Sequence, residues 1–515
     1  MTWFSVLFLF VLSIASTFSA RILGIVSTTS YSHQSAYLPL WKELSLRGHQ
    51  VTILTTDPLR DPTLTNLTEI DCSFSYKTKH RKLNLNELAE VSSTQMIERI
   101  ISAGYDILEE QLQHSMVQNL LKNETEHFDV VLVEAMYTGG AAFAERFNCP
   151  LIQMLSLDAF HCQYHDMGNP SHPVLNPEVM LPFVGKLNFF QRLISVGFSF
   201  VMRYYIGLVA DSQDVLVKKY FGNDYPHLRE TLSKTSMWFV NTNPIFHSVR
   251  PLLPNIIQFG GGTHLKAPKP LPKDLQNLLD RATNGIIYFS LGSNVKSKFL
   301  SQERLAILME TFAELPYTIL WKFEREDLPG KSENVIISKW FPQQDIFRHP
   351  NVKLFITQGG LQSIEEAMYN YIPMIGMPFI ADQKHNVNIL VHKGMGLSLD
   401  FATMDKAALK ETILEILNNP KYRYKVRELA ELVKDQPMTG LERAVWWTEY
   451  VIRHKGAEHL RSPAKDLPLY QYFLLDVIGF CLVVILVAIY ILIKSISLIG
   501  RLLNGILVKT KSKIE

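Results

Sequence analysis

The alternation of apolar runs with glycine turns and polar segments is most regular between residues 352 and 383. A short apolar run at residues 352–356 is long enough for a buried strand, and Thr357-Gln358-Gly359-Gly360 follows it as a glycine turn. Residues 361–370 have the pattern of a helix, and residues 372–377 form a second apolar run. This order places the N-terminus of a helix at the carboxyl ends of a parallel sheet. Free backbone N–H groups and the helix dipole make such an end an anion site, typically for phosphate.

The first half of the chain shows the same alternation of apolar strands, turns and helices. The sequence predicts strands at residues 21–27, 49–54, 128–134 and 149–155, a loop at 28–33, and helices at 34–46 and 141–147. Strands that alternate with helices predict parallel pairing in a Rossmann-like sheet. Ligands of such sheets bind beyond the carboxyl ends of the strands. Because His33 and Glu134 both lie at such ends, we expect them in one crevice.

The second half repeats the architecture. Residues 285–294 predict a strand with a glycine turn, and Gly260-Gly261-Gly262 with the Pro/Lys run after it marks a boundary. We therefore predict an α/β protein with two facing Rossmann-like domains, an N-terminal one at residues 21–262 and a C-terminal one at 273–455, joined by a linker at 263–272.

Both ends of the chain carry apolar segments. Residues 1–20 have a short apolar core and end in Ser19-Ala20, which predicts a signal peptide; an uncleaved anchor is the alternative, because basic residues are missing at the start. Residues 474–493 predict a transmembrane helix, since the uninterrupted run at 477–493 spans roughly 25 Å at ~1.5 Å per residue. A juxtamembrane segment at 456–473 precedes it, and the basic tail at 494–515 is cytosolic by the positive-inside rule.

These signals together predict a single-pass type I protein of the endoplasmic reticulum membrane, with the folded domains in the lumen. The sequons at Asn66 and Asn123 fit N-glycosylation in that compartment. The chain ends in KSKIE, which looks like a dilysine retrieval signal.

Composition narrows the class of partner. The formal charge of +2 argues against a polyanionic partner such as nucleic acid. Four cysteines show no metal-ligand spacing, and with Cys481 in the apolar tail the other three allow at most one disulfide.

The stretch FITQGGLQSIEEAMYNYIPMIGMPFIADQ at residues 355–383 resembles the donor-binding signature of the UDP-glycosyltransferases, position by position. Members of this family move a sugar from a UDP-sugar to a small, usually lipophilic acceptor. The resemblance covers nearly the entire chain and implies the GT-B architecture of two facing Rossmann-like domains. One departure is Gln358, where most members have histidine; glutamine still donates from its amide but is never cationic.

The resemblance assigns the donor site residue by residue. Trp340 stacks on the uracil, Gln343 contacts its polar edge, and Glu366 accepts from the ribose hydroxyls. Asp382 and Gln383 bind the hydroxyls of the donor sugar. By the same resemblance, the diphosphate is bound by Ser293 and by residues at the start of the signature helix, which are Gln358, Gly360, Gln362 and Ser363.

For catalysis, an acceptor hydroxyl needs a base whose pKa lies near neutrality, and the base needs an acid behind it. By resemblance His33 is this base and Glu134 its partner, although the family more often has aspartate there. The implied mechanism is a single displacement with inversion at the anomeric carbon. No Asp-x-Asp motif occurs, so we expect no metal and no cofactor besides the UDP-sugar co-substrate.

Several choices stay open. Residues 187–208 are apolar and aromatic, which fits a helix that lines a lipophilic pocket or rests on a membrane surface, or equally a core helical hairpin. UDP-glucose is the favoured donor and UDP-glucuronate the alternative. A catalytically silent, membrane-anchored binder of lipophilic ligands and a nucleotide-sugar scaffold subunit are the rival functions. A second copy of the chain is a further candidate partner, and the acceptor and the oligomeric state are open.

Overall fold

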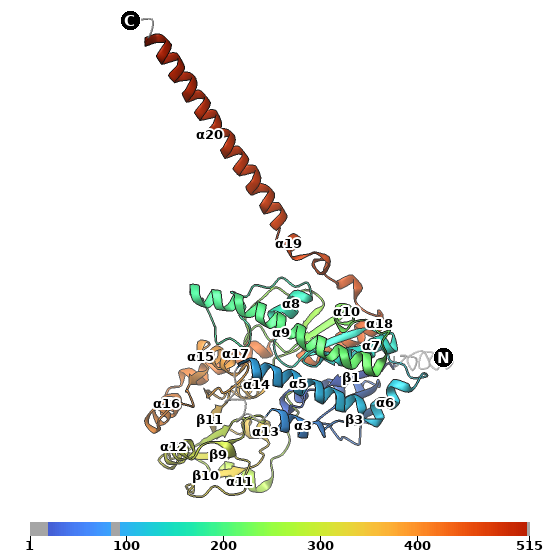
Figure 1. Ribbon diagram of the computed structural model, residues 1–515. Coiled ribbons are helices and arrows are strands. Elements are labelled where there is room, and N and C mark those ends of the chain that lie inside the picture. Colours follow the sequence, from blue (N-terminus) through green and yellow to red (C-terminus); the bar gives the residue numbers. More distant parts are fainter. Residues whose placement is uncertain (1–18, 84–92, 512–515) are drawn as a thin grey trace, which may run out of the picture. The chain divides into compact units, whose positions relative to one another are not determined.

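The computed structural model describes residues 19–83 and 93–511 (Figure 1). The predicted signal peptide and the last residues of the retrieval signal lie outside them, apart from Ser19, Ala20 and Lys511. The chain divides into two compact units, Met1–Arg461 and Ser462–Glu515.

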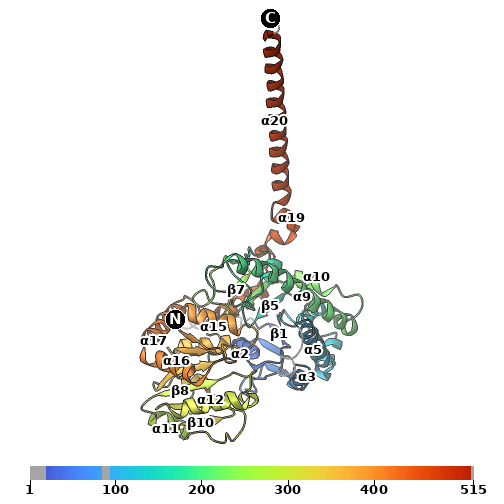
Figure 2. The same cartoon turned by 60° about the vertical axis from the view of Figure 1, so that its left-hand side comes forward.

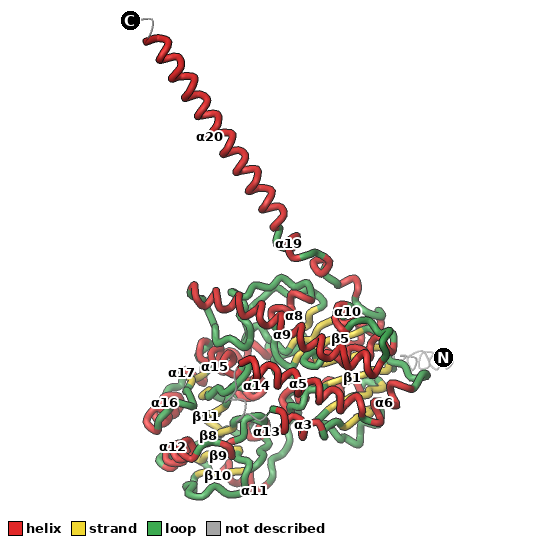
Figure 3. The backbone as a smooth tube through the Cα atoms, viewed as in Figure 1, coloured by secondary structure: helices red, strands yellow, loops and turns green. Residues whose placement is uncertain are grey.

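The first unit contains two parallel sheets, which confirms the predicted α/β class (Figure 3). The seven-stranded sheet has the order β3-β2-β1-β4-β5-β6-β7 and the six-stranded sheet the order β10-β9-β8-β11-β12-β13. The first sheet consists of β1 Arg21–Val26, β2 Gln50–Thr55, β3 Leu67–Asp71, β4 Val130–Glu134, β5 Leu151–Leu155, β6 Met237–Val240 and β7 Ile256–Gln258. The second consists of β8 Ile286–Ser290, β9 Thr318–Lys322, β10 Val335–Ser338, β11 Val352–Thr357, β12 Met374–Gly376 and β13 Gly396–Ser398.

Helices connect the strands of each sheet. In the first half they are α2 Tyr31–Leu46, α3 Ser75–Lys82, α5 Ser93–Gln113, α6 Ser115–Lys122, η1 Thr138–Ala141, α7 Ala142–Phe147, α8 His161–Asp166, α9 Phe189–Phe221 and α10 Leu228–Ser233. In the second half they are α11 Lys273–Arg281, η2 Ser297–Phe299, α12 Gln302–Ala313, α13 Gln343–Phe347, α14 Leu361–Tyr369, α15 Gln383–His392, α16 Lys406–Asn418, α17 Lys421–Lys434 and α18 Gly440–Arg453.

The central strands are buried along their length. Every residue of β4, β5 and β8 is buried, as expected for parallel strands that are covered by helices on both faces. These strands are therefore continuous apolar runs, and the polar residues that follow them gather at one edge of each sheet.

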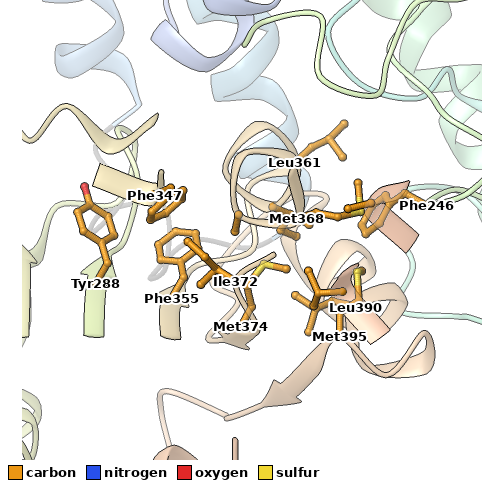
Figure 4. Close-up of a cluster of buried hydrophobic side chains, with 14 of the residues drawn as sticks. Phe246, Tyr288, Phe347, Phe355, Leu361, Met368, Ile372, Met374, Leu390 and Met395 are labelled. Atoms are coloured by element: carbon orange, nitrogen blue, oxygen red, sulfur yellow. The ribbon is translucent and has the colours of Figure 1, made fainter. Parts of the chain in front are cut away.

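The two sheets share one apolar core at their junction. Figure 4 shows Phe246, from the end of the first half, beside Met368 of α14. Leu157 and Phe160, which follow β5, belong to the same buried cluster. This packing fixes how the carboxyl ends of the two sets of strands approach each other.

Helix α18 returns to the first sheet after the second sheet is complete. It begins with a capping box formed by Thr439 and Glu442. Its residues Ala444, Val445 and Ile452 pack in the core under β1 and β4. The predicted domain limits at 262, 272 and 455 stay predictions, but this helix belongs to the core of the first sheet.

One local expectation was wrong. Helix α2 begins at Tyr31, so His33 lies in its first turn and not in a loop. For the segment at 187–208 we left a helix and a helical hairpin open; from Phe189 on it is part of one continuous helix of 33 residues, α9 (Figure 2). Its residues Phe190, Phe200 and Tyr204 are 71%, 68% and 70% exposed, so the lipophilic-surface alternative stays a prediction.

The second unit contains η4 Pro463–Asp466, α19 Leu469–Tyr472 and α20 Leu475–Lys511. Helix α20 runs beyond residue 493 into the segment that we predicted as a tail. Its part from Leu475 to Leu507 is long and apolar enough to cross a bilayer, and by the same criteria of length and composition so is α9. The short helix η3 Glu458–Leu460 lies at the end of the first unit.

Candidate active site

A cleft of about 430 Å³ lies at the carboxyl ends of the strands of both sheets. Every predicted catalytic or donor-binding residue except Glu134 lines it. Those residues are His33, Ser293, Trp340, Gln343, Gln358, Gly360, Gln362, Ser363, Glu366, Asp382 and Gln383. Strand topology thus brings together side chains that are up to 350 positions apart in sequence.

The predicted base and acid are in contact. His33 Nδ1 lies 2.8 Å from Glu134 Oε1. Glu134 is the last residue of β4, which pairs with β1, and it is only 1% exposed. A carboxylate can only accept hydrogen bonds, so Nδ1 carries a proton and Nε2 is left as the basic nitrogen. The longer side chain of glutamate therefore still reaches the imidazole.

Ser156 is a neighbour of this pair that the sequence analysis missed. Its Oγ lies 2.7 Å from His33 Nδ1 and 3.4 Å from Glu134 Oε1. It directly follows β5, the strand beside β4. The rule that singled out His33 and Glu134, that polar residues after parallel strands share one edge, applies to Ser156 as well.

The glycine turn before α14, with Gly292 beside Gln358, forms a cradle that could hold a diphosphate. Gly359 has φ +91°, and a Cβ there would meet Val387 at 2.5 Å, so only glycine allows this turn into α14. Gly292 has φ +75°, and a Cβ would lie 2.1 Å from Gln358 Nε2. The amide of Gln358 thus packs over Gly292. Its buried Oε1 accepts no hydrogen bond from any residue that the structure describes.

Trp340 is positioned for stacking and does not belong to the core. Its side chain is 56% exposed, and it lines the cleft. Tyr31, from the helix that carries His33, meets it edge-on with ring centroids 5.4 Å apart. Lys322 Nζ lies 5.8 Å from the centroid of the Trp340 ring.

Glu366 is held by a network that the sequence analysis did not anticipate. Its Oε2 accepts from Gln343 Nε2 at 2.6 Å, and its Oε1 accepts from Gln344 Nε2 at 2.9 Å. His264 Nε2 lies 3.4 Å from the same Oε1. No motif marked His264 or Gln344, because they come from the segment between the sheets and from the start of α13.

Asp382 and Gln383 begin α15 at the far end of the cradle. Gln383 Oε1 accepts from the backbone N–H groups of Phe379 and Ile380, at 2.9 and 3.0 Å, which leaves its amide nitrogen for a ligand. Asp382 accepts from Asn386 Nδ2 at 2.7 Å. Burial raises the pKa of Asp382, and the side chains of Asn386 and His33 oppose that shift.

Gln362 makes a contact that we did not predict. Its Nε2 donates to the backbone oxygen of Ser156 at 3.0 Å and so crosses from α14 to the first sheet. Its amide therefore connects the two halves of the cleft, and its role at the diphosphate stays a prediction.

The described residues show neither a metal-ligand cluster nor a disulfide. Among the residues that the structure describes, no group of three or more His, Cys, Asp or Glu side chains is arranged to hold a metal ion. Cys72, Cys149, Cys162 and Cys481 are free.

The two predicted sequons differ in environment. Asn66 Nδ2 donates to the backbone oxygens of Ser45 and His49, at 2.8 and 2.7 Å. Asn123 is exposed, and its Oδ1 accepts from the hydroxyl of Thr125 at 2.8 Å.

Comparison with known structures defines the class. The chain has the fold of the glycosyltransferase of kitacinnamycin, with a TM-score of 0.59 and 17% identity over 84% of this chain and 99% of that one. It also has the fold of TcCGT1, solved in complex with UDP, with a TM-score of 0.58 and 15% identity over 85% and 100% of the two chains. The fold is therefore that of the GT-B glycosyltransferases.

The family follows from sequence. The model described as "UDP-glucoronosyl and UDP-glucosyl transferase" matches residues 21–510, and the chain belongs to that family. UDP-glucosyltransferase 2 of Dactylopius coccus is 36% identical over 93% of both chains. UDP-glucuronosyltransferase 2B7 of Homo sapiens is 32% identical over 96% of both. The protein is a UDP-glycosyltransferase, which confirms the predicted resemblance and enzyme class.

Proposed function

We propose that this enzyme transfers a hexose, with glucose favoured, from its UDP-sugar to a hydroxyl of a small lipophilic acceptor, with inversion at the anomeric carbon. The observation that carries the proposal is that His33, with Glu134 Oε1 2.8 Å from its Nδ1, lines the same cleft as Gln358 and Asp382.

His33 takes the acceptor proton at Nε2 while its Nδ1–H donates to Glu134 Oε1. The carboxylate then stabilises the imidazolium that forms. The sugar bond to the UDP oxygen breaks as the bond to the acceptor oxygen forms, so the reaction is one displacement. We assign the stabilisation of the charge that develops on UDP to the start of α14. Gly360 and Ser363 line the cleft there, and the first backbone N–H groups of a helix have no partner within the helix.

The wall near His33 favours a lipophilic acceptor. Met136, Leu157 and Met180 line it beside Tyr31. Apolar walls with few polar groups are typical of small-molecule sites, and burial of an apolar acceptor there contributes roughly 25 cal/mol per Å².

The cleft also favours glucose over glucuronate. Among the described residues, no arginine lines it; its cationic side chains are Lys266, Lys269 and Lys322, besides His33. Lys322 is already paired with Glu324 at 2.8 Å, and Asp382 would repel the carboxylate of a glucuronate. The relative with 36% identity is named a glucosyltransferase. UDP-glucuronate is the second candidate, since a relative with 32% identity is named a glucuronosyltransferase.

We further propose that α20 anchors the enzyme in the endoplasmic reticulum membrane with the first unit in the lumen. The lysine and arginine residues after position 493 support this orientation. The predicted signal peptide and the exposed sequon at Asn123 agree with it.

The experiment uses microsomes that contain the full-length chain, given UDP-glucose or UDP-glucuronate with a panel of phenolic and steroid-like acceptors. We expect β-glucoside products from UDP-glucose and little product from UDP-glucuronate. Product with the donor's own α configuration would contradict the single displacement. UDP binding without any product would favour the silent binder.

A further inference from the structure

Ser156 contacts both halves of the cleft through two different groups. Its hydroxyl lies 2.7 Å from His33 Nδ1. Its backbone oxygen accepts from Gln362 Nε2 at 3.0 Å and from Asn241 Nδ2 at 2.8 Å. The residue is 1% exposed, so water does not compete for these bonds.

The Ser156 hydroxyl lies between the two members of the proposed catalytic pair. Because Ser156 Oγ donates to Glu134 Oε1 at 3.4 Å, a lone pair of this oxygen is available to the Nδ1–H of His33. When Nε2 takes a proton, the Nδ1–H of the imidazolium keeps two acceptors, a carboxylate and a hydroxyl. Two acceptors fix the plane of the ring more tightly than one.

The backbone oxygen connects this arrangement to the donor-binding half. Gln362 is the second residue of α14, the helix whose start faces the diphosphate. Its side chain reaches Ser156 only when α14 lies against the first sheet. The base and the donor cradle are therefore joined through one residue.

We propose that Ser156 is a positioning residue that holds His33 in its reactive orientation and that, through Gln362, makes this orientation depend on closure of the donor-binding half. The inference rests on the proposed role of His33 as base. Glu134 and Asn241 belong to the half that contains the first sheet and hold His33 and Ser156 in either state, whereas the bond from Gln362 forms only when α14 lies against that sheet. The full set of contacts therefore exists only in the closed cleft, where water is excluded and donor hydrolysis is suppressed.

The test is a double-mutant cycle with Ser156→Ala and Gln362→Met, measured on the full-length enzyme. Methionine has nearly the length of glutamine but donates no hydrogen bond. We expect each single change to lower kcat about 10-fold, with the Kd for UDP within twofold of the original. The double variant should lose much less than the 100-fold that independent effects would give. The acid side of the pH profile of kcat should shift in Ser156→Ala, which a purely structural role would not produce.

Two controls keep the test decisive. Ser156→Thr retains the hydroxyl and should recover most of kcat, and the Tm of every variant shows whether the fold is intact. Unchanged kcat and pH profile in a folded Ser156→Ala, or a full 100-fold loss in the double variant, would overturn the inference. Failure of the proposed function is distinct, because then His33→Ala would form product as the original chain does.

Discussion

His264 lies with Nε2 3.4 Å from Glu366 Oε1, while its Nδ1 lies 3.4 Å from Glu365 Oε2. Through His264, the segment between the two sheets thus contacts Glu366, the acid that we propose binds the ribose of the donor. Burial alone would lower the pKa of His264, but the hydrogen bond to Glu366 and the charge of Glu365 outweigh it and raise the pKa.

This contact predicts a pH dependence of donor binding. A raised pKa means that the charged contact is complete below the ordinary histidine pKa of about 6.5 and is lost as the pH rises through the raised value. The KM for the UDP-sugar should therefore rise on the alkaline side. In His264→Gln we expect a KM roughly 5-fold higher at pH 6, the equivalent of about 1 kcal/mol, and no such rise with pH. A pH profile of KM that is the same in both proteins would contradict this role.

Trp340 should account for a large share of nucleotide affinity. Stacking of a base on an aromatic ring contributes about 1–3 kcal/mol. Trp340→Ala should therefore raise the Kd for UDP roughly 5- to 150-fold in isothermal titration, whereas Trp340→Phe keeps a stacking face and should lose less. Equal affinity in all three proteins would mean that the base lies elsewhere.

Gln358 should act on the diphosphate and not on the nucleoside. A hydrogen bond to a charged group contributes about 1.5–3 kcal/mol, so Gln358→Ala should weaken UDP binding roughly 10- to 150-fold. Uridine, which lacks the phosphates, should bind the variant as well as it binds the original protein. A loss that is equal for both ligands would show that the substitution deforms the cleft.

The two sequons should behave differently. Asn123→Gln should remove one glycan, seen as a mobility shift that glycosidase treatment abolishes in the original chain. Asn66→Gln should leave the number of glycans unchanged but lower the Tm, because Nδ2 of Asn66 bonds the carbonyls that close the turn after α2. A second glycan that disappears with Asn66→Gln would contradict this assignment.

Much of the fold was predictable because parallel strands are continuous apolar runs with turns after them. The rule that ligands bind beyond the strand ends is sufficient to place His33 and Glu134 in one crevice. The start of α2 was missed because Ser30, Tyr31 and Ser32 look like loop residues. A single helix and a hairpin both stayed open for residues 187–208, because the exposed apolar positions of α9 hide the helical period.

The connections across the cleft were not predictable from the pattern. Gln362 lies in the signature, yet its bond goes to a backbone oxygen, which every residue type offers. His264 follows the glycine run of the linker, and nothing nearby in sequence indicates the two carboxylates that face it. Such contacts depend on how the two sheets pack against each other, and local sequence does not encode that directly.

The central claim is that His33 is the base for sugar transfer. The most direct measurement is the kcat of His33→Ala at saturating UDP-glucose and acceptor, alongside the Kd for UDP. General base catalysis contributes roughly 10²- to 10⁴-fold, so kcat should fall by that factor while UDP binds as before. Product formation at the original rate by His33→Ala would contradict the account.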